Sequence, residues 1–574
     1  MQFKFSNASK SSLFLFCIAA GLCLSKLSSA APSQSQEQDY SDLVARAQAK
    51  TAAKEWVDAA KLWEKVVEMN PVRGSTWHQL ANAHHQANDY RKAIPAYEKT
   101  LELGFWPAHM AHNVARCYAM LGQNEEALRW LEKALALRFN DLMLLQSDPE
   151  LESLRHDARF QKLVGLVDAS KMSREQGWRY DLDLFRREIE RKGYSPYRKM
   201  SKEQFDAAVR KLQGSVAKLS DVQVIIEMMK LMRMVGDGHS AVWMTPERPE
   251  FRTALPVQFY LFVEGLFVIA TDPKHSDLLG AQVLRFGNRT VNEVLVALDP
   301  LMERDNEMGP KVTAPSWLRH PVVLNGLGLI PDAQSVSLTL RNMDGGTRTV
   351  TLSTNSPDLN IKRILPKAWV SLPEKLEKPV PLYIKNRHLT YWFEHLPQAK
   401  TVYFQFNSVR NDPQEPLDAL INRLFKFINE SEVEKLIIDM RWNNGGNTVL
   451  AQPLIHRLIS NEKINQRGKL FVIIGRRTFS AAQNTATFIE RHTNAIFVGE
   501  PTGAGPNFIG EEDPVTLPYS KIPINVSDVF WQSSWPFDQR TWIGPEIYVP
   551  PTFEAYRANR DPALEAILAY RTKP

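Results

Sequence analysis

The chain has 574 residues, of which 44% are hydrophobic and 23% charged, with a formal net charge of +6. This composition is typical of ordinary globular protein, and the length predicts several domains. The positive charge is weak and diffuse, which excludes an argument for nucleic-acid binding. Beyond the N-terminus no stretch is apolar for long enough to span a membrane.

The N-terminus predicts export. Lys4 and Lys10 precede an apolar segment, Leu13 to Leu24, which is followed by Ser28-Ser29-Ala30. A basic start, a short apolar region and small residues at a cleavage site are typical of a secretory signal peptide. We therefore expect residues 1–30 to be removed and the protein to be periplasmic or extracellular. Cleavage would leave Cys117 as the last cysteine, which rules out an internal disulfide and leaves a cysteine–histidine metal site unsupported.

Residues 31–170 are expected to form a helical repeat domain. Small and large residues recur with a period of about 34 residues, as two antiparallel helices per repeat require. The sequence resembles the tetratricopeptide repeat over roughly residues 40–140, and residues 140–165 suggest a capping helical segment. Two interpretations stay open, a helical spacer and a docking groove for protein partners. The positions in register are Trp77, Leu80, Ala81, Ala93 and Tyr97 with Ala111, Val114, Ala115, Ala127 and Leu131.

The middle of the chain changes from helical to β-rich. Residues 171–250 show helical periodicity and end in the motif Gly236-Asp237-Gly238-His239-Ser240. Residues 251–370 alternate in apolarity around Glu264-Gly265 and Asp344-Gly345-Gly346, which indicates hairpins. One segment, 279–288, loosely resembles a strand segment of a PDZ domain. We therefore expect a helical lobe and then a β-rich, PDZ-like insert.

From residue 371 to residue 574 apolar strands alternate with amphipathic helices. This order predicts a mostly parallel sheet covered by helices, with functional groups gathered where strands end. Strands are expected at 402–406, 436–440, 470–474 and 495–498, and helices at 417–428, 449–459 and 481–490.

Two strand ends carry residues suited to acyl transfer. A diglycine, Gly445-Gly446, follows the second strand, and Ser480 begins the helix that follows the third. A nucleophilic serine needs donors for the developing oxyanion. The N–H of Ala481 would supply one donor, and Gly445 or Gly446 the other. Taken singly, however, a serine at a helix start is an ordinary N-cap and a diglycine is an ordinary turn. Asp439, Arg441 and Asn443 would brace the diglycine turn rather than react.

Together these motifs resemble the C-terminal-processing, or tail-specific, serine protease family. The resemblance rests on Asp-x-Arg-x-Asn-x-Gly-Gly from Asp439, Ser480-Ala481-Ala482, the Val498–Thr502 segment and Gly544–Pro551, and it covers roughly residues 385–570. It implies a ClpP/crotonase-like α/β core. The predicted fold is then multidomain: a tetratricopeptide array, a helical lobe, a β-rich insert and this serine protease core.

The resemblance also assigns a base and an acid. Gly505 occupies the place where one branch of the family carries a dyad lysine, so the chain is closer to the tricorn-core-like branch, whose base is a histidine. His239 matches that histidine, and an imidazole titrating near neutrality suits a general base. Asp538 occupies about the position of the acid that orients the imidazole. Competing acids are Glu500, Glu511, Glu512 and Asp528.

The favoured function is a serine-type peptidase acting through Ser480, His239 and Asp538 on protein or peptide substrates, with no metal or organic cofactor implied. Arg476 and Arg477 either attract a peptide carboxylate or form a solvated charge pair, and the second interpretation is favoured. Two other functions stay open: a non-catalytic protein that binds a peptide or apolar ligand on the same fold, and a repeat-driven scaffold. The absent lysine supports the first of these.

Overall fold

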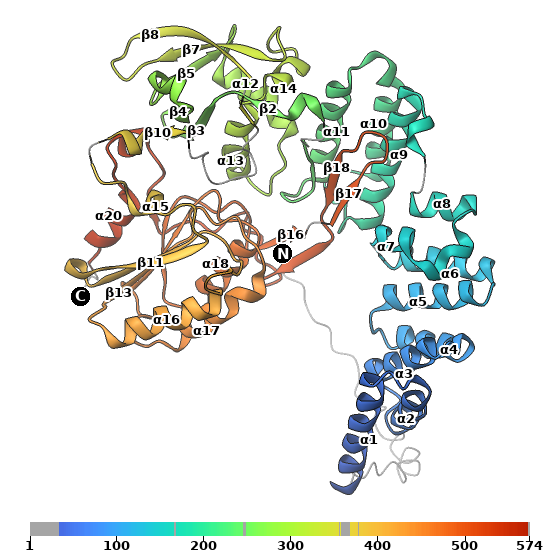
Figure 1. Ribbon diagram of the computed structural model, residues 1–574. Helices are drawn as coiled ribbons and strands as arrows, with labels where there is room; N and C mark the ends of the chain where they lie inside the picture. The colour runs from blue at the N-terminus through green and yellow to red at the C-terminus, as the bar shows by residue number, and fades with distance from the viewer. Residues whose placement is uncertain are drawn as a thin grey trace, which may run out of the picture. The chain divides into compact units, whose positions relative to one another are not determined.

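The computed structural model describes residues 34–139, 141–165, 168–244, 248–354, 356–357, 368–376, 378–511 and 513–571. The predicted signal peptide therefore lies outside the described residues. The chain divides into two compact units, 1–166 and 167–574, which are described separately (Figure 1). Among the described helices, none combines the length and the apolarity needed to cross a bilayer.

The first unit is an array of antiparallel helix pairs. Alanines at the predicted close-approach positions are fully buried, including Ala59, Ala81, Ala93, Ala111 and Ala127, so the helices can pack tightly. A short helical cap follows the array, as expected for the end of a repeat stack. The array comprises α1 (Gln34–Ala52), α2 (Trp56–Met69), α3 (Gly74–Gln86), α4 (Tyr90–Glu102), α5 (Pro107–Met120) and α6 (Asn124–Ala136), and the cap comprises α7 (Leu142–Ser147) and α8 (Ala158–Val164).

The second unit begins with the predicted helical lobe. Its helices are α9 (Arg174–Lys192), α10 (Lys202–Ser215) and α11 (Asp221–Val235). Each begins at a capping box in which a serine and a glutamine satisfy each other's backbone N–H groups. Helix α11 ends at Val235 and is capped by Gly236, which has φ 81°. The left-handed conformation that glycine permits turns the chain out of the helix and into the His239 motif.

The β-rich insert is a seven-stranded sheet in the order β10-β4-β5-β7-β8, with β3 and β6 pairing beside β4 and β5. Both hairpins predicted from the sequence are present, β3 with β4 and β7 with β8. The strands are β3 (Val257–Phe262), β4 (Gly265–Thr271), β5 (Gln282–Phe286), β6 (Arg289–Thr290), β7 (Ser335–Arg341), β8 (Thr347–Ser353) and β10 (Val370–Ser371), and helices α12 (Val291–Leu298), α13 (Met308–Trp317) and α14 (Pro321–Gly326) interrupt them.

The α/β core confirms the predicted sheet. Its strand order is β11-β12-β13-β14-β15-β20, and every pair after the antiparallel β11–β12 pair is parallel. Alternate residues of each strand pack on opposite faces, against α16–α18 on one side and α20 on the other. The elements are β11 (Tyr391–Leu396), β12 (Thr401–Phe406), α16 (Leu417–Glu430), β13 (Lys435–Asp439), α17 (Gln452–Ser460), β14 (Leu470–Ile474), α18 (Ala481–His492), β15 (Ile496–Gly499), β20 (Ile547–Tyr548), α19 (Phe553–Arg557) and α20 (Pro562–Ala569).

A β-arm, defined as residues 507–532, joins the core to the helical lobe. It contains β16 (Asn507–Gly510), β17 (Asp513–Thr516), β18 (Pro523–Val526) and β19 (Val529–Gln532). Strand β18 pairs with β1 (Ala241–Val242), which directly follows the His239 motif. The arm thereby fixes the end of the lobe against the core, and Figure 1 shows β17 and β18 lying beside the lobe helices.

Candidate active site

The site lies at the carboxyl ends of two adjacent parallel strands. Strand β13 ends at Asp439, which is paired in register with Ile473 of β14. The turn after β13 carries the diglycine, and the loop after β14 leads to Ser480 at the start of α18. Parallel strands bring their carboxyl ends to one edge of a sheet, so the two motifs meet there.

The backbone of Ser480 is strained. Its φ of 55° and ψ of −129° are far from the ordinary conformation of a residue with a side chain. Such a conformation costs on the order of 1–3 kcal/mol and persists only where the surroundings enforce it. The Ser480 side chain makes no capping hydrogen bond to the helix, although serine is a favoured N-cap. Ser480 is half-buried, and its hydroxyl is therefore held at the helix tip without a capping role.

Gly445 packs directly on Ser480. A Cβ placed on Gly445 would lie 2.7 Å from the Ser480 Cβ and 2.9 Å from the Ala481 nitrogen, so no side chain fits there. The N–H of Gly445 donates to Asn443 Oδ1 at 3.0 Å. The N–H groups of Gly446 and Ala481 donate to no acceptor among the described residues. Of the two predicted glycines, Gly446 thus retains a free donor while Gly445 supplies the close approach.

The diglycine turn is braced by a buried ionic cluster. Arg441 donates from Nε to Asp439 Oδ1 at 3.0 Å and from both terminal nitrogens to Asp561 at 3.0 and 2.9 Å. Tyr403 donates to the other oxygen of Asp439. Asn443 donates to the carbonyl of Phe406 at 2.9 Å. The bracing role predicted for these residues is confirmed, and the turn is rigid because its polar groups are paired.

His239 lies against the segment that carries Ser480. Its ring stacks on Phe479 with centroids 4.3 Å apart and 22° between the planes, and Phe508 of β16 stacks at 5.5 Å and 9°. Phe479 is the residue before Ser480, so the imidazole reaches the nucleophile's own loop although it comes from the distant helical lobe. His239 is 4% exposed. Among the described residues, neither ring nitrogen makes a hydrogen bond of good geometry, and the backbone of Ile509 is the polar group that interacts with the ring.

The arm and Asp237 position the His239 loop. Asp237 Oδ1 accepts from the N–H of His239 at 3.0 Å and from the hydroxyl of Ser527 at 2.8 Å. Ser240 is tied to Ser527 as well, through its Oγ. Burial lowers the pKa of His239 to about 4, while the carboxylate of Asp237 and the backbone of Ile509 act in the opposite direction. The imidazole is therefore neutral at physiological pH, the form a general base requires.

A second carboxyl group, Asp305, lies under the same loop. Its Oδ1 accepts from the N–H of Gly238 at 2.9 Å, whereas Oδ2 is buried and has no partner among the described residues. Burial, and then the nearby Asp237, raise the pKa of Asp305 to about 7. Asp305 lines a cavity of about 260 Å³ together with Lys199 and Gly505. Lys199 donates to the carbonyl of Gly236, so its amine is engaged within the lobe.

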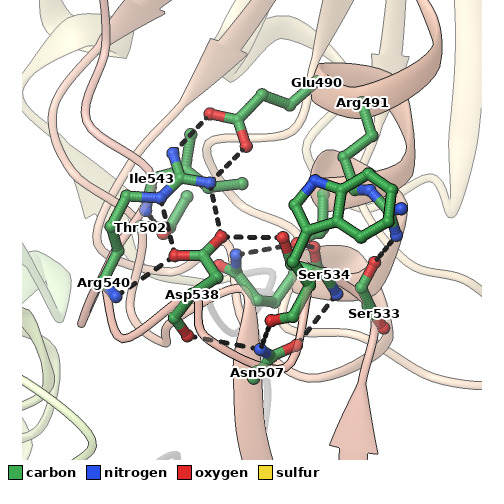
Figure 2. A network of polar contacts seen from close by, with 12 residues as sticks. Glu490, Arg491, Thr502, Asn507, Ser533, Ser534, Asp538, Arg540 and Ile543 are labelled. Carbon is green, nitrogen blue, oxygen red and sulfur yellow. Dashed lines mark hydrogen bonds and ion pairs between the residues drawn. The ribbon is translucent and has the colours of Figure 1, made fainter. Parts of the chain in front are cut away.

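Asp538 is not placed against His239. Its carboxylate accepts from Arg540 Nε at 3.0 Å and Nη2 at 2.8 Å, and from the Ser534 hydroxyl at 2.7 Å (Figure 2). The hydrogen bond from Arg540 is the main reason that the pKa of Asp538 falls below its ordinary value. Arg540 in turn pairs with Glu490 of α18. The expected contact between Asp538 and the imidazole is therefore absent, because a cation two residues away holds the carboxylate.

The competing acids occupy different environments. Glu500 forms a buried bidentate pair with Arg476, at 2.7 and 2.9 Å, so the interpretation of Arg476 as solvated is wrong. Glu512 lies outside the described residues. Glu511 directly follows Gly510, on which a Cβ would lie 3.4 Å from His239 Cε1. Asp528 directly follows Ser527, and the arm register pairs the neighbours Gly510 and Val529. Glu511 and Asp528 thus flank the His239 loop.

The sequence reasoning missed several residues that shape the site. Asp237 could have been found, because an aspartate two residues before His239 suits a side-chain turn that accepts backbone N–H groups. Phe479 and Phe508 carry no signal of their own, since aromatic residues are usually core. Asp305 comes from the β-rich insert, and no motif connects it with the other residues.

Comparisons with known proteins agree with this architecture. Residues 400–515 match the model of peptidase family S41, and residues 76–111 and 108–141 match models of the tetratricopeptide repeat. The α/β core, with its serine at a strained helix tip, therefore defines a serine-type peptidase domain joined to helical repeats. More particularly, the chain carries a domain of peptidase family S41, as its motifs predicted.

Individual relatives are distant. Mature CPAF is 13% identical with a TM-score of 0.47, over 68% of this chain and 96% of that one. The photosystem II D1 C-terminal processing protease is also 13% identical, with a TM-score of 0.33 over 68% of this chain and 96% of that one. A curated relative, a chloroplastic protein of Arabidopsis thaliana, is 34% identical over 84 residues, 14% of this chain. That match spans about 25% of the relative's length.

Proposed function

We propose that the protein is an exported peptidase in which Ser480 is the nucleophile and His239 the general base. The observation that carries the proposal is the strained Ser480, with φ 55°, packed on Gly445 at the tip of α18. Strain of this kind is kept where it serves function. Because the hydroxyl caps nothing, its position is explained by attack on a bound carbonyl.

The proposed reaction is acyl transfer. Ser480 Oγ bonds to the substrate's carbonyl carbon and gives its proton to His239, and the oxyanion is stabilised by the N–H groups of Gly446 and Ala481. The C–N bond then breaks as the imidazolium protonates the leaving amine. Water, deprotonated by His239, attacks the ester and releases the acid and free Ser480. The acid that orients His239 is proposed to be Asp528 or Glu511, since these flank its loop and Asp538 is held elsewhere.

Location and partners follow from the flanking regions. The basic, apolar and small-residue pattern of residues 1–30 supports export to the periplasm or beyond. The repeats support recruitment of a protein, since arrays of this kind present extended surfaces. Several large apolar side chains of the array are exposed, among them Val72 at 76% and Trp106 at 59%. Pull-down with the Ser480→Ala chain, compared with a chain that also carries Trp106→Ser, tests this surface.

A second candidate function is non-catalytic binding of a peptide on the same fold. Two observations favour it: neither nitrogen of His239 has a partner among the described residues, and Gly505 stands where a dyad lysine would be. Such a protein would bind peptides equally well with or without the Ser480 hydroxyl. The enzyme and the binder therefore differ in the reactivity of one oxygen atom.

A fluorophosphonate probe with casein as the test substrate separates the two. We expect Ser480 to be labelled and casein to be cleaved, with both lost in Ser480→Ala. In His239→Ala the cleavage rate should fall by about 10⁴-fold or more, as for other serine–histidine pairs. An unlabelled wild-type protein that still binds peptides would favour the binding function, and labelling that persists in Ser480→Ala would exclude Ser480 as the nucleophile. Circular dichroism of each variant controls for folding.

A further inference from the structure

Two carboxyl groups hold the backbone of the loop that carries His239. Asp237 Oδ1 accepts from the N–H groups of His239 at 3.0 Å and of Ser240 at 2.6 Å. Asp305 Oδ1 accepts from the N–H of Gly238 at 2.9 Å. Three successive N–H groups are therefore satisfied by two side chains. Asp237 belongs to the loop itself, whereas Asp305 comes from the β-rich insert, 67 residues after Gly238.

Asp305 lies where the segments of the base and the nucleophile meet. A Cβ placed on Gly238 would lie 3.1 Å from Asp305 Oδ2 and 3.0 Å from Phe479 Cζ. Phe479 directly precedes Ser480, and its ring stacks on the imidazole of His239. The backbone of Gly238 thus packs both on the Asp305 carboxyl and on the Phe479 ring. A shift of Asp305 would therefore change the distance between the base and the nucleophile.

The imidazole depends on anchors of its loop backbone. Neither ring nitrogen of His239 makes a hydrogen bond of good geometry among the described residues. The position of the ring follows instead from the loop backbone and from the stacked rings of Phe479 and Phe508. A general base must lie within hydrogen-bond reach of the proton that it removes, and small displacements slow the reaction strongly. An anchor of the loop is therefore also an anchor of the base.

The core in turn fixes Asp305 through the next residue, Asn306. The side-chain amide of Asn306 donates to the carbonyls of Thr502 at 3.0 Å and Thr541 at 2.6 Å, both in loops of the core. Arg304, on the other side of Asp305, is buried and paired with two acids of the insert. This short segment of the insert therefore links the core to the His239 loop.

The charged groups around Asp305 leave it one hydrogen bond. Asp305 lines the cavity of about 260 Å³ together with Arg198 and Lys199 of the helical lobe and with Asp538 and Arg540. The last two are paired with each other, and the two lobe cations donate to a backbone carbonyl. Asp305 Oδ2 is buried without a partner among the described residues. Because an unpaired buried carboxyl costs free energy, stability does not explain its presence.

We propose that Asp305 is a positioning residue for the general base. By accepting from Gly238 it sets the place of His239 against the loop of Ser480, and Asn306 ties this setting to the core. The β-rich insert thereby contributes to catalysis through a side chain that acts on the backbone of another segment. This inference rests on the proposed peptidase function and adds to it a residue that no sequence motif includes.

The kinetic test compares Asp305→Ala, which removes the acceptor, with Asp305→Asn, which keeps one. In Asp305→Ala we expect kcat for casein cleavage to fall about 10- to 100-fold while KM changes by less than about 3-fold, because a displaced base slows the chemical step. Asp305→Asn should restore kcat to within about 3-fold of the unmodified value, since the Gly238 hydrogen bond is kept. The matched control is Asp344→Ala, which removes the acceptor of another glycine N–H, that of Gly346 at 2.8 Å, from a hairpin of the same insert.

The pH dependence of Ser480 labelling by the fluorophosphonate probe gives a readout that a loss of stability alone does not move. Burial lowers the pKa of His239 from 6.5 to about 4. In Asp305→Ala the loosened loop admits water to the imidazole, so the pH of half-maximal labelling should rise from near 4 toward the ordinary value. Asp305→Asn should keep the low midpoint, and so should Asp344→Ala.

Hydrogen–deuterium exchange separates this inference from the peptidase function. Exchange in the peptide covering residues 236–242 requires no catalysis, and it should be about 10-fold faster in Asp305→Ala and unchanged in Asp305→Asn. Unchanged exchange in Asp305→Ala, or an Asp305→Asn variant as impaired as Asp305→Ala, overturns the inference. If the unmodified chain is not labelled but exchange responds as predicted, the peptidase function fails and the positioning of His239 stands.

A second variant decides if Asp305→Ala does not fold, as judged by circular dichroism. Asn306→Ala leaves the Asp305 carboxyl in place but removes its link to Thr502 and Thr541. We expect a fall in kcat and a rise in the labelling midpoint, both in the same direction as for Asp305→Ala. An Asn306→Ala variant with unmodified kcat and midpoint would contradict the inference.

Discussion

The diglycine turn and the His239 loop contribute to one site but differ in how their polar groups are satisfied. Asp439, Arg441 and Asn443 each have several hydrogen-bond partners, so the turn after β13 is fixed before any substrate arrives. In the His239 loop, both imidazole nitrogens and one oxygen of Asp305 are buried without partners among the described residues. Each such group costs about 1–3 kcal/mol.

The difference separates a part of the site whose bracing side chains are paired from a part whose buried polar groups are not. The oxyanion side is preorganised, which is the arrangement that stabilises developing charge most effectively. The base side instead keeps buried polar atoms of His239 and Asp305 that have no hydrogen-bond partner among the described residues. Four predictions test this contrast, in order of decreasing effect.

Gly445→Ala should have the largest effect. Its Cβ would lie 2.7 Å from the Ser480 Cβ, and the residue has φ 101°, so the turn must move and an oxyanion donor with it. We expect the rate of casein cleavage to fall by about 100- to 1000-fold. Gly345→Ala is the control, since it shares a left-handed φ of 90° but meets nothing within 4 Å. Similar losses in the two variants would mean that backbone strain, not the site, is responsible.

Asp561→Asn should reduce stability more than activity. It removes the charge that faces both terminal nitrogens of the buried Arg441, while Asp439 remains as its partner. We expect the free energy of unfolding in urea to fall by about 3 kcal/mol. Glu565→Gln, which breaks the exposed pair with Arg560, should change it by less than about 0.5 kcal/mol. A loss of that small size in Asp561→Asn would contradict the rigid turn.

Asp305→Asn should stabilise the protein at alkaline pH. The folded-state pKa of about 7 lies above the ordinary value of 3.8, so the folded state favours the protonated acid. That contribution is complete below pH 4 and is lost as the pH rises through 7. An uncharged asparagine avoids the loss and still accepts from Gly238. We expect a gain on the order of 2 kcal/mol at pH 8 and little change at pH 4, measured by urea unfolding. An equal change in stability at pH 4 and pH 8 would contradict the raised pKa of Asp305.

Asp538→Asn should have the smallest effect. Its carboxylate is held by Arg540 and Ser534, and among the described residues no hydrogen bond joins it to His239. We expect casein cleavage to stay within about 3-fold of the unmodified rate, as for groups outside the reacting centre. Asp528→Asn provides the comparison, because Asp528 follows Ser527 beside the His239 loop. A loss in Asp538→Asn as large as that in His239→Ala would restore Asp538 to the triad.

The sequence predicted what local pattern determines. Strands β12 to β14 were located to within a residue at each end, because apolar runs bounded by turn residues define buried parallel strands. The diglycine turn and Ser480 followed from their places at strand ends. The prediction that Asp538 orients His239 was wrong, because the carboxylate pairs with Arg540. Which cation lies nearest to a carboxylate is decided only once the chain has folded. The Phe479–His239–Phe508 stack and the position of the Asp305 carboxyl depend on contacts between distant segments, which no local pattern encodes.

The most direct test of the central claim is the pH dependence of Ser480 labelling by the fluorophosphonate probe, followed by mass spectrometry. Because burial lowers the pKa of His239 to about 4, the base stays neutral well below pH 6.5. We predict a label on Ser480, a rate that is constant from about pH 8 to pH 5 and half-maximal near pH 4, and loss of the reaction in His239→Ala. A label on another residue, or an unchanged rate in His239→Ala, would contradict the account.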